Sequence, residues 1–231
     1  MSLYLTIELL TLSVPLALSF DKKVAYFRLW KYLFPAIIIS AAFFIAVDIW
    51  FTRLGVWGFN PEYHSGIIIA HLPLEEYLFF LIIPFSSIFI HYVFLAYFPG
   101  KKIGRKSTAV LTCLLISLLV ILSLANKDRI YTSFYSAYMA ILLAIAYFIN
   151  SSLLSSFYLS FLIILIPFFA VNGILTGSFI KGEVVWYNAS GILGLRLLTV
   201  PVEDTVYGFS MILTSLLLMN LSGNKISGGK V

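Results

Sequence analysis

The sequence contains a single cysteine, Cys113, and only 11% of its 231 residues are charged. One cysteine excludes a disulfide within the chain and a metal site built from several thiolates. So few charged side chains cannot cover the surface of a soluble domain of this length, and 61% of the residues are hydrophobic. The composition therefore predicts an integral membrane protein.

Several motifs of cofactor and metal chemistry are also missing. Neither a G-x-G-x-x-G segment nor a P-loop is present, which argues against a nucleotide-binding fold. The four aspartates never occur at D-x-x-x-D spacing, so we expect no magnesium–diphosphate site. The last apolar run has no lysine that could hold retinal, which argues against a photoreceptor. We expect no metal and no cofactor.

Seven apolar runs are long enough to cross a bilayer, which takes roughly 20 residues of helix. They cover approximately residues 3–20, 32–52, 74–98, 108–125, 131–150, 153–172 and 196–220. Only a helix satisfies its own backbone polar groups in lipid. The predicted fold is therefore an all-α integral membrane protein with seven transmembrane helices.

The basic residues are unevenly distributed among the connections between these runs. Ten of the fifteen fall on one side of the membrane if all seven runs cross it: Lys22, Lys23, Arg28, Lys31, Lys101, Lys102, Arg105, Lys106, Lys225 and Lys230. The positive-inside rule makes that side cytoplasmic, so we expect the N-terminus outside the cell membrane and the C-terminus inside. The net charge of +5 is then a topology signal, supported by anionic lipid, and we expect no nucleic-acid partner.

Two acidic segments repeat each other. The sequence PLEEYLFF at 73–80 matches PVEDTVYG at 201–208. The alignment pairs Pro73 with Pro201, Glu75 with Glu203, Glu76 with Asp204, and Phe79 with Tyr207. Upstream, GVWGFN at 55–60 faces EVVWYN at 183–188, and AVDIW at 46–50 faces AVNGI at 170–174. These pairs make Trp57 equivalent to Trp186 and Asp48 equivalent to Asn172.

We infer a duplication with a 3+1+3 arrangement of helices. Residues 1–100 form the first three-helix repeat, residues 101–130 contain the linking fourth helix, and residues 131–231 form the second repeat. Equivalent helices are four spans apart, so both repeats run in the same direction through the membrane. We expect their polar residues to meet around one pseudo-symmetric centre in the outer half of the bundle.

The paired acids allow two interpretations. Carboxylates after a proline suit the first turn of a helix, where the dipole and free amides favour negative charge. Two observations argue against a purely capping role. The acid pair recurs at equivalent places, and Arg196 is the only basic residue near either motif that could neutralise it. Buried carboxyl groups without a cation tend to stay protonated, which is what a general acid requires. We expect Glu75 and Glu203 to face the site with Glu76 and Asp204 in support, although the reverse orientation remains open.

Aromatic residues accompany the acids. Phe79, Phe80 and Tyr207 follow them by about one helical turn, where ring faces stabilise a carbocation through the quadrupole. Trp57 and Trp186, in the outer loops, are candidates both for this lining and for an interfacial aromatic belt. Asn172 is a candidate hydrogen-bond partner for a carboxyl group.

These residues resemble the small integral-membrane lycopene β-cyclases, here as one fused chain. The resemblance rests on P-x-E-E-x-x-F-F, P-x-E-D-x-x-Y-G and an F-x-x-x-D-x-W segment at 44–50, and it covers about residues 30–215. It implies an intramolecular lyase or isomerase that cyclises acyclic carotenoid end groups through a carbocation, without redox change. Glu75 or Glu203 would then be the acid, and Glu76, Asp204 or Asp48 the base or proton-holding partner.

The expected partners are an acyclic carotenoid and membrane lipid. Other carotenoid-pathway enzymes and a second copy of the chain are further candidates. Two other functions fit the same acids: a proton-coupled transporter or lipid carrier, and another carotenoid enzyme such as a hydratase. Transport without conversion would identify the first, and a product heavier by one water the second.

Overall fold

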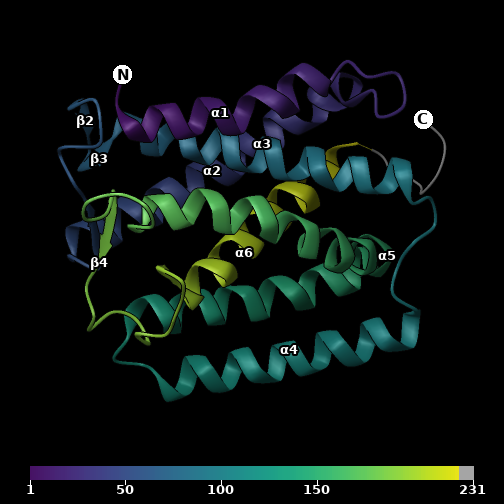
Figure 1. Ribbon diagram of the computed structural model, residues 1–231. Coiled ribbons are helices and arrows are strands. Elements are labelled where there is room, and N and C mark those ends of the chain that lie inside the picture. The colour runs from purple at the N-terminus through teal and green to yellow at the C-terminus, as the bar shows by residue number, and fades with distance from the viewer. Residues whose placement is uncertain (224–231) are drawn as a thin grey trace.

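The computed structural model describes residues 1–223 as a bundle of helices that run side by side along one long axis (Figure 1). The helices are α1 (Leu3–Leu18), η1 (Tyr26–Leu29, a 3-10 helix), α2 (Trp30–Arg53), α3 (Leu74–Tyr97), α4 (Arg105–Ala125), α5 (Ile130–Leu175) and α6 (Val202–Ser222). Five of them are long and apolar enough to cross a membrane, while α1 has only 16 residues. An all-α, multi-pass membrane protein is confirmed.

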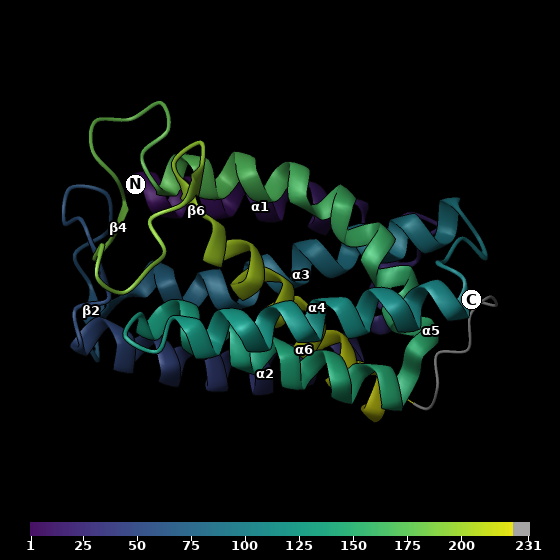
Figure 2. The ribbon, with the colours of Figure 1, turned by 90° about the horizontal axis from the view of Figure 1, so that it is seen from below.

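Helix α5 is 46 residues long and breaks in the middle. Asn150 has φ −154° and ψ 80°, which is not helical, and its Oδ1 accepts a hydrogen bond of 3.0 Å from the amide of Leu153. Asn150 thus caps the second half of the helix. The two halves run in opposite directions along the bundle (Figure 2). They correspond to the predicted runs 131–150 and 153–172.

The last predicted run, 196–220, begins too early. Residues 196–201 form a hairpin of β5 (Arg196–Leu197) and β6 (Val200–Pro201), and α6 starts only at Val202. Leu198 has φ 57°, a left-handed conformation that no right-handed helix accepts. Pro201 then occupies the N-cap, where its missing N–H costs nothing. An equivalent hairpin of β2 (Ile68–Ile69) and β3 (Leu72–Pro73) precedes α3.

A third strand pair joins the two halves of the chain. Strand β1 (Trp57–Phe59) pairs antiparallel with β4 (Val185–Tyr187), and Gly58 lies opposite Trp186. The flanking hydrogen bonds mirror each other. The amide of Asn188 donates to the Val56 carbonyl at 2.8 Å, and the amide of Asn60 donates to the Val184 carbonyl at 2.9 Å. This pairing has the form expected of a local two-fold axis between equivalent loops.

The equivalence of Trp57 and Trp186 is off by one residue. The hairpins β2–β3 and β5–β6 repeat at a spacing of 128 residues, from Ile68 to Arg196, and the spacing from β1 to β4 is the same. By that spacing Trp57 corresponds to Val185, and Gly58 corresponds to Trp186. Matching by residue type placed the two tryptophans together, whereas the strand pairing sets the true register.

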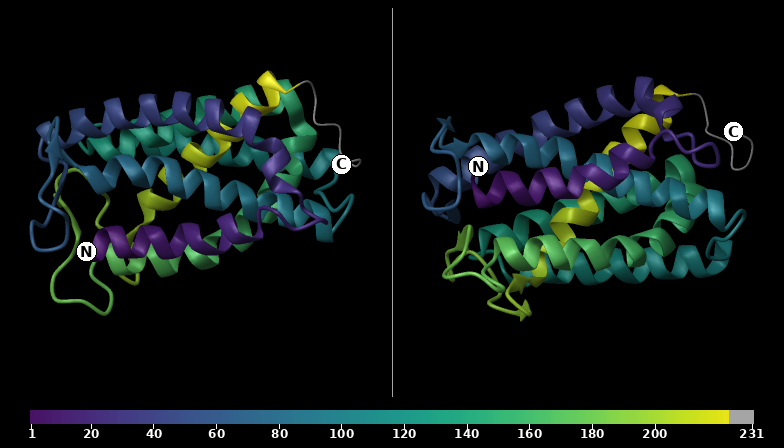
Figure 3. Two further views of the ribbon diagram at one scale, coloured as in Figure 1. Left: turned by 90° about the horizontal axis from the view of Figure 1, so that it is seen from above. Right: turned by 45° about the horizontal axis from the view of Figure 1, so that its top comes forward.

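Helix α6 runs obliquely through the middle of the bundle, packed against α2, α3 and α5 (Figure 3). The hairpins gather at one end of the bundle, and the basic connections between α1 and α2 and between α3 and α4 lie at the other. Lys23 illustrates this, since its Nζ lies 3.5 Å from the centroid of the Tyr97 ring at the end of α3. Lys225 and Lys230 lie outside the described residues.

Candidate active site

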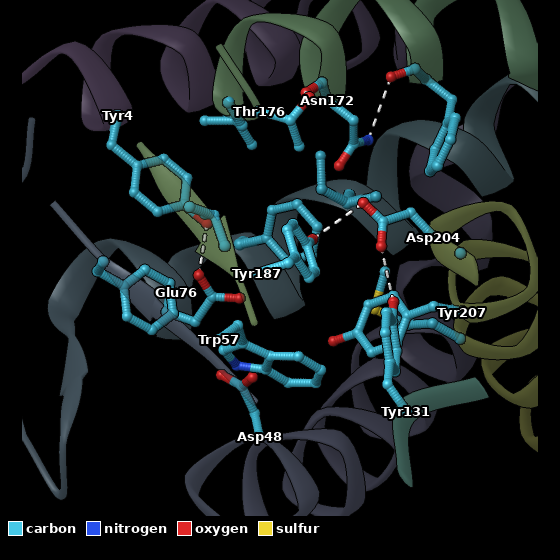
Figure 4. A pocket seen from close by; sticks show the side chains of 18 residues that line it. Tyr4, Asp48, Trp57, Glu76, Tyr131, Asn172, Thr176, Tyr187, Asp204 and Tyr207 are labelled. Atoms are coloured by element: carbon cyan, nitrogen blue, oxygen red, sulfur yellow. Dashed lines mark hydrogen bonds between the residues drawn. The ribbon is translucent and has the colours of Figure 1, made fainter. Parts of the chain in front are cut away.

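A small cavity of about 50 Å³ lies at the hairpin end of the bundle. Five helices and both central strands contribute to its wall, so residues from the two halves of the chain meet there (Figure 4). The lining includes Tyr4, Asp48, Trp57, Glu76, Tyr131, Asn172, Thr176, Tyr187, Asp204 and Tyr207. Of the polar residues expected to converge on one centre, Asp48, Glu76, Asn172 and Asp204 line this cavity.

Glu76 enters the cavity from the first turn of α3 and is only 6% exposed. Its Oε2 accepts a hydrogen bond of 2.6 Å from the hydroxyl of Tyr4 on α1. Within residues 1–223, Tyr4 is the one side-chain donor to this carboxyl group. Its second oxygen lies on the cavity side of the group (Figure 4).

Asp204, the equivalent residue on α6, is held by two tyrosines. The hydroxyl of Tyr131 donates to Oδ1 at 2.8 Å, and that of Tyr187 donates to Oδ2 at 2.9 Å. Tyr187 belongs to β4, outside the helices. Burial, and then the neighbouring charge of Asp204, raises the pKa of Tyr187 well above its ordinary value. Tyr187 therefore keeps its proton and remains a donor to Asp204.

Asp48 completes the acidic group from the last turns of α2, where it is 2% exposed. The indole nitrogen of Trp57 faces its carboxyl group (Figure 4). Within residues 1–223, the Oδ2 atom of Asp48 has no hydrogen-bond partner. Asn172 lies on the far side of the cavity and donates through Nδ2 to the Phe168 carbonyl at 3.1 Å, not to an acid.

Glu75 and Glu203 do not line the cavity, contrary to the expected orientation. Glu75 accepts hydrogen bonds from Ser2 Oγ at 2.7 Å and from the amide of Ser65 at 2.6 Å. Glu203 accepts equivalent bonds from Thr132 Oγ1 and from the amide of Leu193, both at 2.6 Å. Neighbouring residues point about 100° apart on a helix, so one acid of each pair faces the cavity while the other anchors the preceding loop.

Of the predicted aromatic residues, some line the cavity and others lie outside it. Phe79 and Tyr207 line the cavity, whereas Phe80 is fully buried outside it and packs near Phe44. Trp186 is 39% exposed and is absent from the lining. Side chains alternate across a strand, and those of Val185 and Tyr187 line the cavity. The indole of Trp186 therefore lies on the other face of β4, where it covers Gly58.

Sequence reasoning missed the hydroxyl donors Tyr4 and Tyr131. A signal was available, because the first helix of each half begins with a tyrosine beside serine or threonine: Ser2 and Tyr4 in one half, Tyr131 and Thr132 in the other.

Glu8 was also missed. It lies one turn after Tyr4 on α1, is 1% exposed, and neither carboxyl oxygen has a partner within residues 1–223. An unpaired charge at such a place is very costly, so this residue is suited to holding a proton.

The chemistry available in the cavity is proton transfer on an apolar substrate. None of the lining residues is basic, and several are aromatic. Within residues 1–223, no group of three histidine, cysteine or acidic side chains is arranged to hold a metal ion. The cavity offers carboxyl groups on opposite walls, ring faces between them, and little room for water.

Comparison with known protein families gives a match that covers most of the chain. The family model described as lycopene cyclase matches residues 1–94 and 126–222, one segment for each repeat, with α4 between them. No curated protein and no solved structure matches the chain.

Proposed function

Since the chain belongs to the lycopene cyclase family, we propose that it closes acyclic carotenoid end groups into β-type rings by acid catalysis within the membrane. The reaction is an isomerisation of the intramolecular lyase type, with no redox change. The observation that carries the proposal is the placement of Glu76 and Asp204. These acids come from equivalent positions of the two repeats and share one cavity without a basic residue in its lining.

We assign Glu76 as the general acid and Asp204 as the base. Hydrogen bonds to an ionised carboxyl stabilise its charge. Asp204 accepts two from tyrosines, which suits an acceptor of protons, whereas Glu76 accepts one and keeps an oxygen for donation. Asp48 is the proton-holding partner, because its carboxyl lies in the same cavity beside the Trp57 indole.

The assigned steps balance without a co-reactant. The Glu76 proton adds to the terminal alkene of the end group, which leaves a tertiary cation. The neighbouring internal alkene attacks that cation, forms the ring bond and moves the positive charge to a ring carbon. Asp204 removes the adjacent proton and restores a double bond, so the product is an isomer of the substrate.

The cation needs stabilising surfaces and protection from water. The rings of Phe79, Tyr207 and Trp57 line the cavity, and aromatic faces attract cations through their quadrupole. Water in the site would capture the cation and give an alcohol. The cavity of about 50 Å³ has room for only a few water molecules, and it must widen to admit an end group.

Expression in a lycopene-accumulating host, followed by chromatography of the pigments, tests the function. We expect cyclic pigment with the natural chain and none with the double variant Glu76→Gln, Asp204→Asn at equal protein abundance. Glu62→Gln is the control, because Glu62 is exposed in an outer loop. A product heavier by one water would mean a hydratase. Unchanged lycopene moved between vesicles would mean a carrier.

We also propose seven spans in a 3+1+3 arrangement in the cell membrane, with the acids near the outer face. The two antiparallel halves of α5 supply two of the spans, and the basic connections lie at the end opposite the acids. Single cysteines in a Cys113→Ala background test the orientation. A membrane-impermeant maleimide should label Glu62→Cys in intact cells, but Lys102→Cys only after permeabilisation. The opposite pattern would invert the topology.

A further inference from the structure

Two apolar cavities extend the acid cavity along the bundle. The middle cavity, of about 390 Å³, lies between α1, α3 and the second half of α5. It shares Ile83, Phe168 and Asn172 with the acid cavity. The distal cavity, of about 430 Å³, continues the same crevice toward the basic end and shares Phe89 and Ile90 with the middle one. Together they form one groove that leads away from Glu76.

We propose that this groove binds the polyene chain of an acyclic carotenoid along α3, with one end group in the acid cavity. This inference rests on the proposed function and names the site that holds the rest of the substrate. Glu76 and Tyr97, which line its two ends, are 21 positions apart on α3, or about 32 Å at 1.5 Å per residue. That length matches the bilayer core of about 30 Å, which a rigid C40 polyene also spans.

The lining of the groove matches a hydrocarbon. The middle cavity contains the hydroxyl groups of Thr11, Ser86 and Ser87. Thr11 donates to the Ile7 carbonyl at 2.8 Å, and Ser86 donates to the Thr11 carbonyl at 3.2 Å, so two of the three hydroxyl groups are bound to backbone. Apolar side chains form most of the remaining surface, as a polyene requires.

The groove is accessible from the lipid side. Helix α1 runs beside the second half of α5 (Figure 3) but packs chiefly along α3. Leu10 and Val14, on the α1 wall, are 67% and 60% exposed. Ala170, on the facing wall of α5, is also exposed and has a small side chain. A membrane-dissolved substrate therefore enters sideways between these helices.

One consequence concerns the order of the two cyclisations. Among the described residues, the paired acids lie at one end of the groove only, so a bound carotenoid presents one end group at a time. Closing the second ring requires the monocyclic product to leave, turn around and bind again. Free monocyclic pigment is therefore expected to precede the bicyclic product.

Lycopene retention by purified protein tests the groove without requiring turnover. The double variant Glu76→Gln, Asp204→Asn, which is expected to leave lycopene unconverted, is purified from a lycopene-accumulating host, alone and with Ala170→Trp or Val93→Trp, which fill the middle and distal cavities respectively. We expect each tryptophan to lower the lycopene bound per protein about tenfold. Leu114→Trp is the control, because Leu114 is 64% exposed on α4, away from the groove.

The outcomes separate the groove from the proposed function. Equal retention in all four proteins, with the natural chain still cyclising lycopene, would overturn the groove and leave the function standing. Loss of cyclisation in the natural chain would overturn the function instead. Using two tryptophan variants guards against misfolding of one, and only variants purified in the monodisperse form of the parent protein are compared.

Discussion

The adjacent glutamates of α3 provide the most informative pair of substitutions. Glu76→Gln keeps the shape of the side chain and an oxygen that can accept from Tyr4, but it removes the proton that the cavity would deliver. General acid catalysis typically contributes a factor of about 10² to 10⁴. At 1.36 kcal/mol per tenfold, we expect Glu76→Gln to raise the barrier by about 2.7–5.4 kcal/mol with protein abundance unchanged.

Glu75→Gln should lower the stability of the protein and leave turnover nearly unchanged, the reverse of the effects expected for Glu76→Gln. Glu75 lies outside the cavity and accepts hydrogen bonds from Ser2 and Ser65, which fix the loop before α3. Hydrogen bonds to charged groups contribute about 1.5–3 kcal/mol each. Loss of about 2 kcal/mol lowers the midpoint of thermal unfolding by roughly 4–8 °C in a chain of this size. Turnover should stay within about tenfold of the natural chain, since no proton-transfer group is lost.

Turnover in reconstituted vesicles and thermal unfolding of the same preparations measure both effects. The assignment requires a crossed result, in which Glu76→Gln is slow but stable and Glu75→Gln is active but less stable. If instead Glu75→Gln abolished turnover while Glu76→Gln remained within tenfold, the outward residue would be the acid. The reasoning from cavity geometry would then be refuted.

Three further predictions concern Asp204, Tyr187 and Glu8. Tyr187→Phe removes one of the two donors to Asp204 and should slow turnover about tenfold, as should Tyr131→Phe; an effect confined to substrate affinity would count against Asp204 as the base. Because the pKa of Tyr187 is raised above its ordinary value of about 10, the natural chain should lose no activity through its deprotonation between about pH 7 and 10, and a Tyr187-dependent alkaline limb in the pH–rate profile would contradict this. Glu8→Gln should leave membrane abundance unchanged, whereas Glu8→Lys should lower it, because only the second places a full charge at the buried position; equal abundance would indicate that Glu8 is solvated.

Much of the fold was predictable because apolar length is a strong signal in lipid. The limits of α3, after Pro73, were close to the prediction for that reason, and Pro201 marked the true start of α6 just as clearly. The hairpin before α6 was not predicted, since its six residues are apolar enough to extend the run, although the backbone angle at Leu198 and then Pro201 break the helix. A hydropathy profile carries no information about left-handed backbone conformations.

The site was predictable as a set of residue types and positions, but the orientation of each side chain was not. Recurrence of the acid pairs located the right turn of α3 and α6. Which acid of a pair faces inward depends on the partners of the other, and those include the backbone amides of Ser65 and Leu193. Backbone amides carry no sequence signature. The misaligned Trp186 has a similar cause, because strand register and not residue type decides which side chain faces the cavity.

The central claim is that a carboxyl proton starts the reaction and a different carboxyl ends it. Turnover of lycopene by purified protein in D₂O tests this directly through the mass of the isolated product. Carboxyl protons exchange with solvent between turnovers, so we predict one deuterium gained for each ring formed, at a carbon that does not exchange. A cyclic product without deuterium, or a product carrying added D₂O, would contradict the account.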